Sequence, residues 1–207
     1  MVNTLLNNRY FITQKLDNGG FCDIYKAYDI YDEYFNNKKD IVIKMPNEEL
    51  KKKDDIQEFI YMEYKILRKL SNDNIIKVFD FGIDNTLNIS YLVLEYLDGI
   101  LLSDIKKSSL DKKQKDEISE SLRKALRYIH KKNIIHADLS PNNIMIVENR
   151  AVIFDFGVSF DIKDTLKLDY KVNSYINKNY SSKNIKSGKK PSFDCDKYSL
   201  SLILDEL

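Results

Sequence analysis

The sequence has few cysteines and no long apolar run. Its two cysteines, Cys22 and Cys195, belong neither to a Cys-x-x-Cys pair nor to a Cys/His cluster, so neither a disulfide framework nor a zinc site is indicated. No apolar stretch approaches the roughly 18 residues of a membrane span, and the first residues lack the basic start and apolar core of a signal peptide. These absences predict a cytoplasmic protein without a membrane partner.

An excess of charge of either sign is also missing. The 33 Lys and Arg residues oppose 32 Asp and Glu residues, for a formal net charge of +1, and the two signs are mixed along the chain. A chain with this balance has no overall field for a polyanion, so we expect no nucleic-acid partner. The 207 residues are enough to bury one substantial core or two small ones.

The first 96 residues predict a mainly β unit. Several runs are rich in β-branched and aromatic residues, and the first two flank Asp17-Asn18-Gly19-Gly20, a turn typical of a β-hairpin. The five predicted strands are residues 9–16, 21–28, 40–45, 75–81 and 90–96.

One helix is predicted within this unit. Apolar residues recur at helical spacing from Ile56 to Leu70, which indicates a single buried stripe. Glu63 falls on that stripe, and a buried carboxylate is costly unless a cation pairs with it. The helix therefore requires a basic partner from another element.

The rest of the chain predicts a mainly helical second unit with one small hairpin. A polar stretch from about 161 to 191 shows no periodicity, and a loop of that length in a compact protein is usually functional or disordered. The predicted helices are 101–107, 112–132 and 194–207, and the hairpin strands are 143–147 and 151–154.

Seven short motifs follow one another along the chain in a fixed order. They are Leu16-x-x-Gly19-x-Phe21-x-x-Ile24, Ile41-Val42-Ile43-Lys44, Glu63, Leu92-Val93-Leu94-Glu95-Tyr96, His136-Ala137-Asp138-Leu139-x-x-x-Asn143, Asp155-Phe156-Gly157 and Asp196-Lys197-Tyr198-Ser199-Leu200. Each is weak alone, but their order and spacing resemble the eukaryotic-type (Hanks-type) protein kinase family.

This resemblance implies an α+β, bilobal protein-kinase-like fold. It implies a five-stranded antiparallel N-lobe sheet plus one helix, and a shortened, mainly helical C-lobe. Residues 1–207 would form a single protein kinase domain, with the N-lobe at about 1–96, the hinge at about 95–99 and the C-lobe at about 100–207. The family continues with several more helices, so we expect a minimal or truncated member whose short C-lobe is covered by an activating or stabilising partner.

The resemblance also implies a site for ATP and Mg²⁺. Moving a γ-phosphoryl group requires a held triphosphate, a neutralising metal and a positioned hydroxyl. The catalytic residues would be Asp138 as the base, with Lys44 and Glu63 as an ion pair, and the metal ligands would be Asn143 and Asp155. The implied ATP-binding residues are Leu16, Gly19, Phe21, Ile24, Val42, Lys44, Glu95, Leu97 and Met145. His136 would be a packed core residue touching Phe156 and Asp196.

Four positions depart from the family. Asp17 and Cys22 stand where its glycine-rich loop has glycines, which predicts weaker nucleotide binding. Ala137 replaces the arginine that would bind a phosphorylated loop, so we expect activity that does not depend on phosphorylation of the segment between Gly157 and Pro191. Ser140 makes the catalytic loop similar to that of RIO-type atypical kinases, which leaves the substrate class open.

We therefore predict a protein kinase that phosphorylates a protein substrate on serine or threonine rather than tyrosine. A pseudokinase or partner-binding module is favoured by Asp17 and Cys22, and a small-molecule phosphotransferase shares the catalytic Asp and Asn. The intact Asp155-Phe156-Gly157 argues against the second of these alternatives. If the source is a bacterium, delivery of the protein into a host cell is a further alternative.

Overall fold

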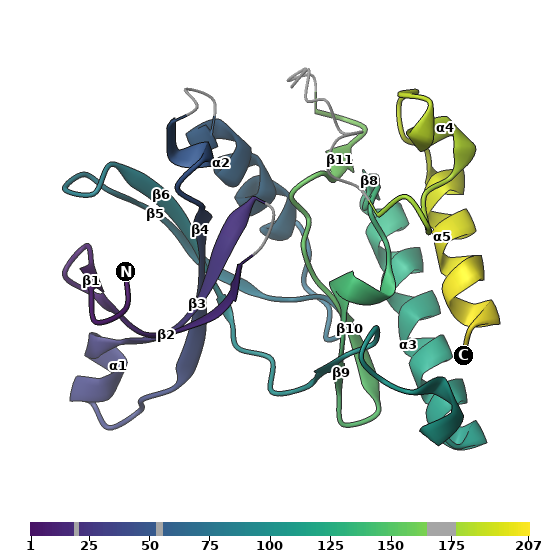
Figure 1. Ribbon diagram of the computed structural model, residues 1–207, viewed down its shortest axis with the longest axis horizontal. Helices are drawn as coiled ribbons and strands as arrows, with labels where there is room; N and C mark the ends of the chain where they lie inside the picture. The colour runs from purple at the N-terminus through teal and green to yellow at the C-terminus, as the bar shows by residue number, and fades with distance from the viewer. Residues whose placement is uncertain (19–20, 53–55, 165–176) are drawn as a thin grey trace. The chain divides into compact units, whose positions relative to one another are not determined.

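The computed structural model describes residues 1–18, 21–52, 56–164 and 177–207 (Figure 1). The chain divides into two compact units, residues 1–68 with 77–96 and residues 69–76 with 97–207. Segment 69–76, which the sequence places in the first unit, thus packs with the second: Ile76 N–H donates to Ile153 O at 3.0 Å.

Strands dominate the first unit and helices the second. The strands are β1 (Leu5–Leu6), β2 (Tyr10–Asn18), β3 (Cys22–Asp29), β4 (Asp40–Pro46), β5 (Val78–Asp84), β6 (Ile89–Glu95), β7 (Ile100–Leu101), β8 (Ile134–Ile135), β9 (Ile144–Val147), β10 (Arg150–Ile153) and β11 (Phe160–Asp161). The α-helices are α1 (Ile30–Tyr34), α2 (Ile56–Leu67), α3 (Lys112–Lys131), α4 (Lys183–Lys186) and α5 (Phe193–Asp205), and the 3₁₀ turns lie at Leu50–Lys52, Lys107–Ser109 and Pro141–Asn143.

The first unit is an antiparallel sheet in the order β1-β2-β3-β4-β6-β5. Side chains alternate between its two faces because successive residues of a strand point to opposite sides. One face forms a hydrophobic core centred on Ile12, Ile43 and Tyr91, each at most 1% exposed. The other face carries Lys44, towards which α2 directs Glu63.

This sheet has one more strand than the five that the sequence predicts. Leu5 and Leu6 pair with Phe11 and Tyr10 to form the edge strand β1. A two-residue strand has no alternation that could reveal it. The sequence also does not reveal the single-turn helix α1, whose N-cap Asp29 accepts a hydrogen bond from Tyr31 N–H.

In the second unit, α3 and α5 run side by side, and α3 packs against β10 (Figure 1). A capping box begins α3: Asp111 accepts from Gln114 N–H, and the Gln114 side chain accepts from Asp111 N–H. The apolar stripe that predicts α3 is its buried face, from Ile118 to Ile129. None of the helices in the described ranges is long and apolar enough to cross a membrane.

The predicted helix over residues 101–107 is wrong. Ile100 and Leu101 instead pair with Ile146 and Met145, and Leu102 N–H donates to Ile144 O at 2.9 Å. A segment of fewer than two turns gains too few hydrogen bonds to offset helix nucleation, so pairing with the β9–β10 hairpin is more favourable there.

Candidate active site

Lys44 lies on β4, on the face of the sheet that the sequence predicts to bind a nucleotide. Its Cα is paired with that of Ile24 on β3, and Val42 lies two residues before it on β4. Directly opposed and alternate residues point to the same face of a sheet. The register therefore places Ile24, Val42 and Lys44 together, as the sequence predicts.

The predicted ion pair between Lys44 and Glu63 is present. Lys44 Nζ lies 2.8 Å from Glu63 Oε1 and 2.8 Å from Oε2, and both side chains are buried. A buried charge that loses its partner costs about 3–5 kcal/mol. The pair therefore ties α2 to β4 and fixes the position of the Lys44 ammonium.

Replacing both partners of this pair is expected to destabilise the protein by less than the sum of the two single replacements. Lys44→Met and Glu63→Gln should each lower the free energy of unfolding by about 3–5 kcal/mol, because each leaves one buried group uncompensated. The double variant should lose less than the sum, by about 1–3 kcal/mol, in urea denaturation. Phosphate-transfer rates should be non-additive in the same sense.

The partly exposed Lys26–Asp40 pair, at 2.8 Å on neighbouring strands, is the matched control. Its cycle, Lys26→Met with Asp40→Asn, should give an interaction energy below about 1 kcal/mol. Equal interaction energies in the two cycles would contradict the special role of the Lys44–Glu63 pair.

The other predicted ATP-binding residues of the first unit occupy varied positions. Leu16 on β2 is 39% exposed, and Phe21 stacks on Phe59 of α2 with ring centroids 5.6 Å apart. Glu95 ends β6, where it is paired with Ile41 of β4, and its backbone N–H donates to Lys77 O at 3.0 Å. Gly19 lies outside the described residues.

In the second unit, Asp138 is held on both carboxylate oxygens. Asn143 Nδ2 donates to Asp138 Oδ2 at 3.0 Å and to Asp138 O at 2.8 Å, and Asn177 N–H donates to Oδ1 at 2.7 Å. Burial raises the pKa of Asp138, with a smaller contribution from the nearby Asp155 carboxylate, while the Asn177 hydrogen bond lowers this pKa. An ionised carboxylate has about four acceptor positions, so each oxygen can accept a further hydrogen bond.

Asn143 also connects the Asp138 loop to Asp155. Asn143 O accepts from Phe154 N–H at 3.0 Å, which places the amide residue beside the end of the strand that leads to Asp155. Because Asn143 Nδ2 is committed to Asp138, its Oδ1 is the atom left to accept from or bind a ligand. Asp155 is exposed and has φ 62°, a left-handed conformation that Asp tolerates better than most residues.

The remaining predicted residues of the second unit are His136, Met145 and Leu97. His136 packs on Phe156 with ring centroids 4.7 Å apart, and both are fully buried, which confirms the prediction of a core histidine. Met145 lies on β9, half-buried and paired with Val152. Leu97 is the first residue of the second unit after Tyr96 and is half-buried.

A buried carboxylate holds the backbone that leads to Asp138. Asp196 on α5 accepts from the backbone N–H groups of His136 and Ala137, each at 2.9 Å, and lies 2.8 Å from His130 Nε2 on α3. These contacts hold Ala137 at φ 68°, a conformation that costs a non-glycine residue about 1–2 kcal/mol. The sequence places Asp196 on an apolar stripe and predicts its contact with His136, but not the partner His130.

Asn177 is the site residue that sequence reasoning missed. Its contact with Asp138 uses the backbone N–H, which every residue except proline carries, so the side-chain pattern contains no signal for it. Ser181 Oγ donates to Asn177 O at 2.8 Å, and Ser199 Oγ on α5 donates to Tyr180 O at 2.8 Å. The segment that follows Asn177 is therefore fixed to α5.

The chain resembles known proteins along nearly its whole length. A family model for the protein kinase domain matches residues 10–207. A probable serine/threonine-protein kinase of Clostridium perfringens is 30% identical over 210 residues, which cover 100% of this chain and 30% of that protein. Human serine/threonine-protein kinase tousled-like 1 is 34% identical over 165 residues, 74% of this chain and 21% of that protein.

A bacterial relative gives a similar result. Serine/threonine-protein kinase PknB of Mycolicibacterium smegmatis is 30% identical over 165 residues, 77% of this chain and 26% of that protein. The chain thus spans only about a fifth to a third of the length of these relatives. Because the family model covers both units and every motif considered above, this chain belongs to the protein kinase family, whose members are phosphotransferases.

Proposed function

We propose that the chain is an ATP- and Mg²⁺-dependent protein kinase domain that phosphorylates serine or threonine side chains of a protein substrate. The observation that carries the proposal is the arrangement around Asn143. The side-chain Nδ2 of Asn143 donates to Asp138 Oδ2 at 3.0 Å. The backbone carbonyl of Asn143 accepts from the N–H of Phe154, the residue before Asp155. A candidate base and two oxygen donors for a metal are thereby held in one small region of the second unit.

Asp138 is proposed as the group that accepts the substrate hydroxyl hydrogen. Its carboxylate is oriented on both oxygens by Asn143 and Asn177, so little reorientation is needed when a hydroxyl binds. During transfer the hydroxyl oxygen forms a bond to the γ-phosphorus, and the bond from that phosphorus to the bridging oxygen of ADP breaks. The hydroxyl proton passes to Asp138.

The donor chemistry of Asn143 and Asp155 fits Mg²⁺. Hard divalent cations prefer carboxylate and amide oxygens, and Asn143 Oδ1 is left free for this use because Nδ2 is committed to Asp138. When bound, the ion would neutralise charge on the phosphates. Asn143 and Asp155 would hold it, and the hydrogen bonds from Asn143 to Asp138 would keep the amide oxygen oriented.

In the first unit, the sheet face that carries Lys44 is proposed to bind the nucleotide. Lys44 would contact the α- and β-phosphates, and Ile24 and Val42 on the same face would contact adenine. Family membership further suggests Leu16, Gly19, Phe21, Glu95 and Leu97 as nucleotide contacts. Residues 1–207 would together form one catalytic domain.

The test is incubation of the purified protein with γ-labelled ATP and a generic acceptor protein, with Mg²⁺ and with Mg²⁺ removed by EDTA. We expect label on the acceptor only with Mg²⁺, and phosphoserine or phosphothreonine after hydrolysis. Nucleotide binding without transfer to any acceptor would instead identify a pseudokinase. Transfer confined to a small-molecule alcohol would identify a small-molecule phosphotransferase.

A further inference from the structure

A run of lysines follows the segment that holds Asp138. Residues 177–190 contain no aspartate or glutamate and five lysines, all of them exposed: Lys178, Lys183, Lys186, Lys189 and Lys190. We call residues 177–190 the lysine segment. Within the part of the chain that the structure describes, none of these five ammonium groups forms an ion pair, whereas Lys197 nearby lies 2.9 Å from Asp194.

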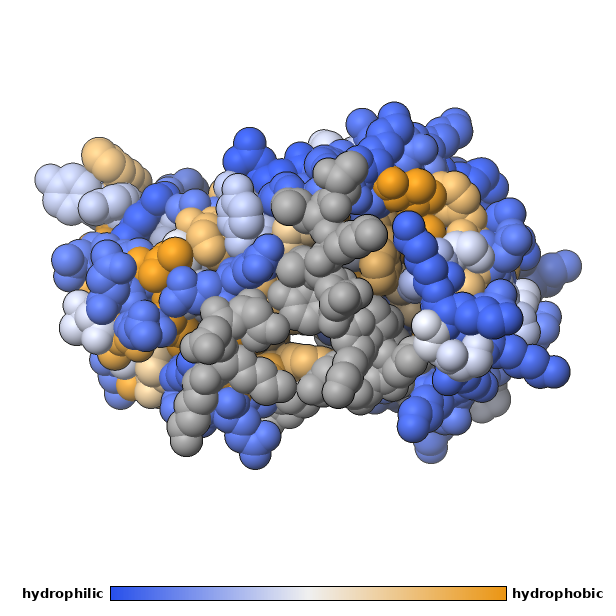
Figure 2. Space-filling view, turned by 90° about the horizontal axis from the view of Figure 1, so that it is seen from above, coloured by the Kyte–Doolittle hydropathy of each residue, from blue (hydrophilic) through white to orange (hydrophobic). Residues whose placement is uncertain are grey.

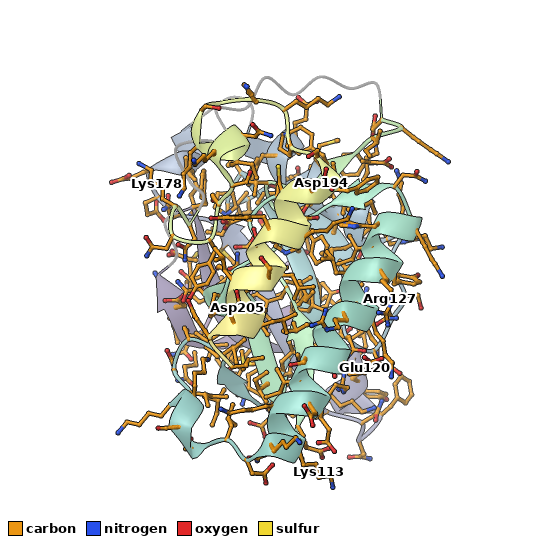
Figure 3. All side chains as sticks on the ribbon, turned by 90° about the vertical axis from the view of Figure 1, so that its right-hand side faces the viewer. Lys113, Glu120, Arg127, Lys178, Asp194 and Asp205 are labelled. Carbon is orange, nitrogen blue, oxygen red and sulfur yellow. The ribbon has the colours of Figure 1, made fainter. Side chains whose placement is uncertain are left out.

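The surface around this segment is polar. Figure 2 shows a largely hydrophilic surface on the second unit, on the right of the view. Figure 3 places Lys178 at the edge of this unit, apart from the labelled carboxylates Asp194 and Asp205. Within the described residues, two carboxylates contact the segment, Asp138 through Asn177 N–H and Glu206 through Tyr180 OH, and neither forms an ion pair with one of its five lysines.

The lysine segment is held in place at several points. Asn177 N–H donates to Asp138 Oδ1 at 2.7 Å, and Tyr180 OH donates to Glu206 Oε2 at 2.6 Å. Further along, Ile185 is 1% exposed and packs against Cys195 and Val158. The lysines thus project from a backbone that is anchored to the unit's core and to the proposed base itself.

The distance along the chain from the base to the first lysine is very short. Lys178 directly follows Asn177, and consecutive Cα atoms are about 3.8 Å apart. An extended substrate advances about 3.3 Å per residue, so residues two to five positions from the acceptor lie about 7 to 17 Å from the reacting hydroxyl. Lys178 is therefore close enough to meet flanking residues of a bound substrate, and the four lysines that follow extend the positive charge along the same anchored segment.

We propose that the lysine segment binds acidic residues that flank the acceptor hydroxyl, so that the substrate class is an acidic segment of a protein. This inference rests on the proposed function. Lysines are flexible point charges without a fixed fork geometry, which suits aspartate or glutamate at several positions rather than one. A nucleic-acid surface is less favoured because the segment offers no row of exposed aromatic side chains on which bases could stack.

The test compares two peptides with one serine each, flanked either by aspartate and glutamate or by asparagine and glutamine. The full chain is treated with phosphatase beforehand, so that phosphates on the protein do not occupy the lysines. We expect kcat/KM to be about tenfold higher for the acidic peptide, because two or three exposed ion pairs together give about this factor. The gain should come from a lower KM for the acidic peptide and not from a higher kcat. The preference should shrink in 0.5 M salt (about 4 Å Debye length).

A quadruple variant, Lys183→Gln with Lys186→Gln, Lys189→Gln and Lys190→Gln, should lose this preference and keep the rate on the neutral peptide. The matched control removes four exposed lysines of α3 instead, as Lys112→Gln, Lys113→Gln, Lys124→Gln and Lys131→Gln, and should keep the preference. Equal use of both peptides by the unmodified protein, or a preference that survives in the quadruple variant, overturns the inference.

A binding measurement separates this inference from the proposed function. Fluorescence anisotropy of labelled peptides should show tighter binding of the acidic peptide, and this difference should vanish in the quadruple variant. If no phosphate reaches either peptide but this binding pattern holds, the proposed function fails while the acidic surface stands. If a single-stranded RNA of equal charge binds more tightly than the acidic peptide, the lysine segment is a nucleic-acid surface and the inference is wrong.

Discussion

Asp155→Asn is expected to abolish detectable phosphate transfer at Mg²⁺ concentrations that saturate the unaltered protein. Groups that merely hydrogen-bond to a metal ligand contribute about 10–100-fold to affinity or activity, so loss of a charged ligand should cost at least on the order of 10²-fold. Raised Mg²⁺ should restore part of the rate, because the amide oxygen of asparagine remains a weak donor. The measurement is the initial rate of label transfer against Mg²⁺ concentration.

Asparagine is the informative substitution at this position because of the backbone. Asp155 has φ 62°, and asparagine occupies this left-handed region readily, whereas alanine there costs about 1–2 kcal/mol. Asp155→Ala should therefore be inactive and also less stable. Asp205→Asn, at an exposed carboxylate of α5, is the control that should change neither property (Figure 3). A normal rate and normal Mg²⁺ dependence in Asp155→Asn would refute the assignment.

Asp138→Asn is expected to lower kcat by on the order of 10²–10⁴ and to leave ATP binding nearly unchanged. The asparagine oxygen can still accept from Asn177 N–H, but its amide nitrogen would face Asn143 Nδ2, so that two donors meet where a hydrogen bond of 3.0 Å existed. Asn143 keeps its second bond to the backbone carbonyl of residue 138.

The measurements are single-turnover transfer rates and nucleotide affinity by titration. The temperature of thermal unfolding should be shifted only slightly, because only one of the four hydrogen bonds at this residue is lost. A variant that transfers phosphate at the rate of the unaltered protein would show that Asp138 is not the base. A variant that no longer binds ATP would show that its role is structural.

Much of the first unit could be predicted from the sequence. Along the third predicted strand, Ile41, Ile43 and Met45 alternate with Val42 and Lys44, which indicates a strand with two different faces. In the helix, Ile60, Glu63 and Leu67 recur at helical spacing, which indicates one buried stripe. Because each pattern arises within one element, it can be detected without knowing the fold. A buried Glu63 then requires a cation, and Lys44 at 2.8 Å meets that requirement.

Short elements could not be predicted in this way. The two-residue strands β1 and β7 are too short to show the alternation of apolar and polar residues that reveals a strand. Their pairing depends on neighbours that the rest of the fold brings close. Leu101 is compatible with a helix by local pattern, but Met145, 44 positions further along the chain, is the partner that makes it a strand.

The motifs of the candidate site were determined by the sequence itself, since the order and spacing of Lys44, Glu63, Asp138, Asn143 and Asp155 are properties of the chain. Their orientation was decided only by tertiary structure. Asn177 reaches Asp138 across 39 positions through a backbone N–H, and His130 reaches Asp196 across 66. Such contacts depend on the path of the intervening chain and on groups that every residue shares, so no local pattern of side chains could reveal them.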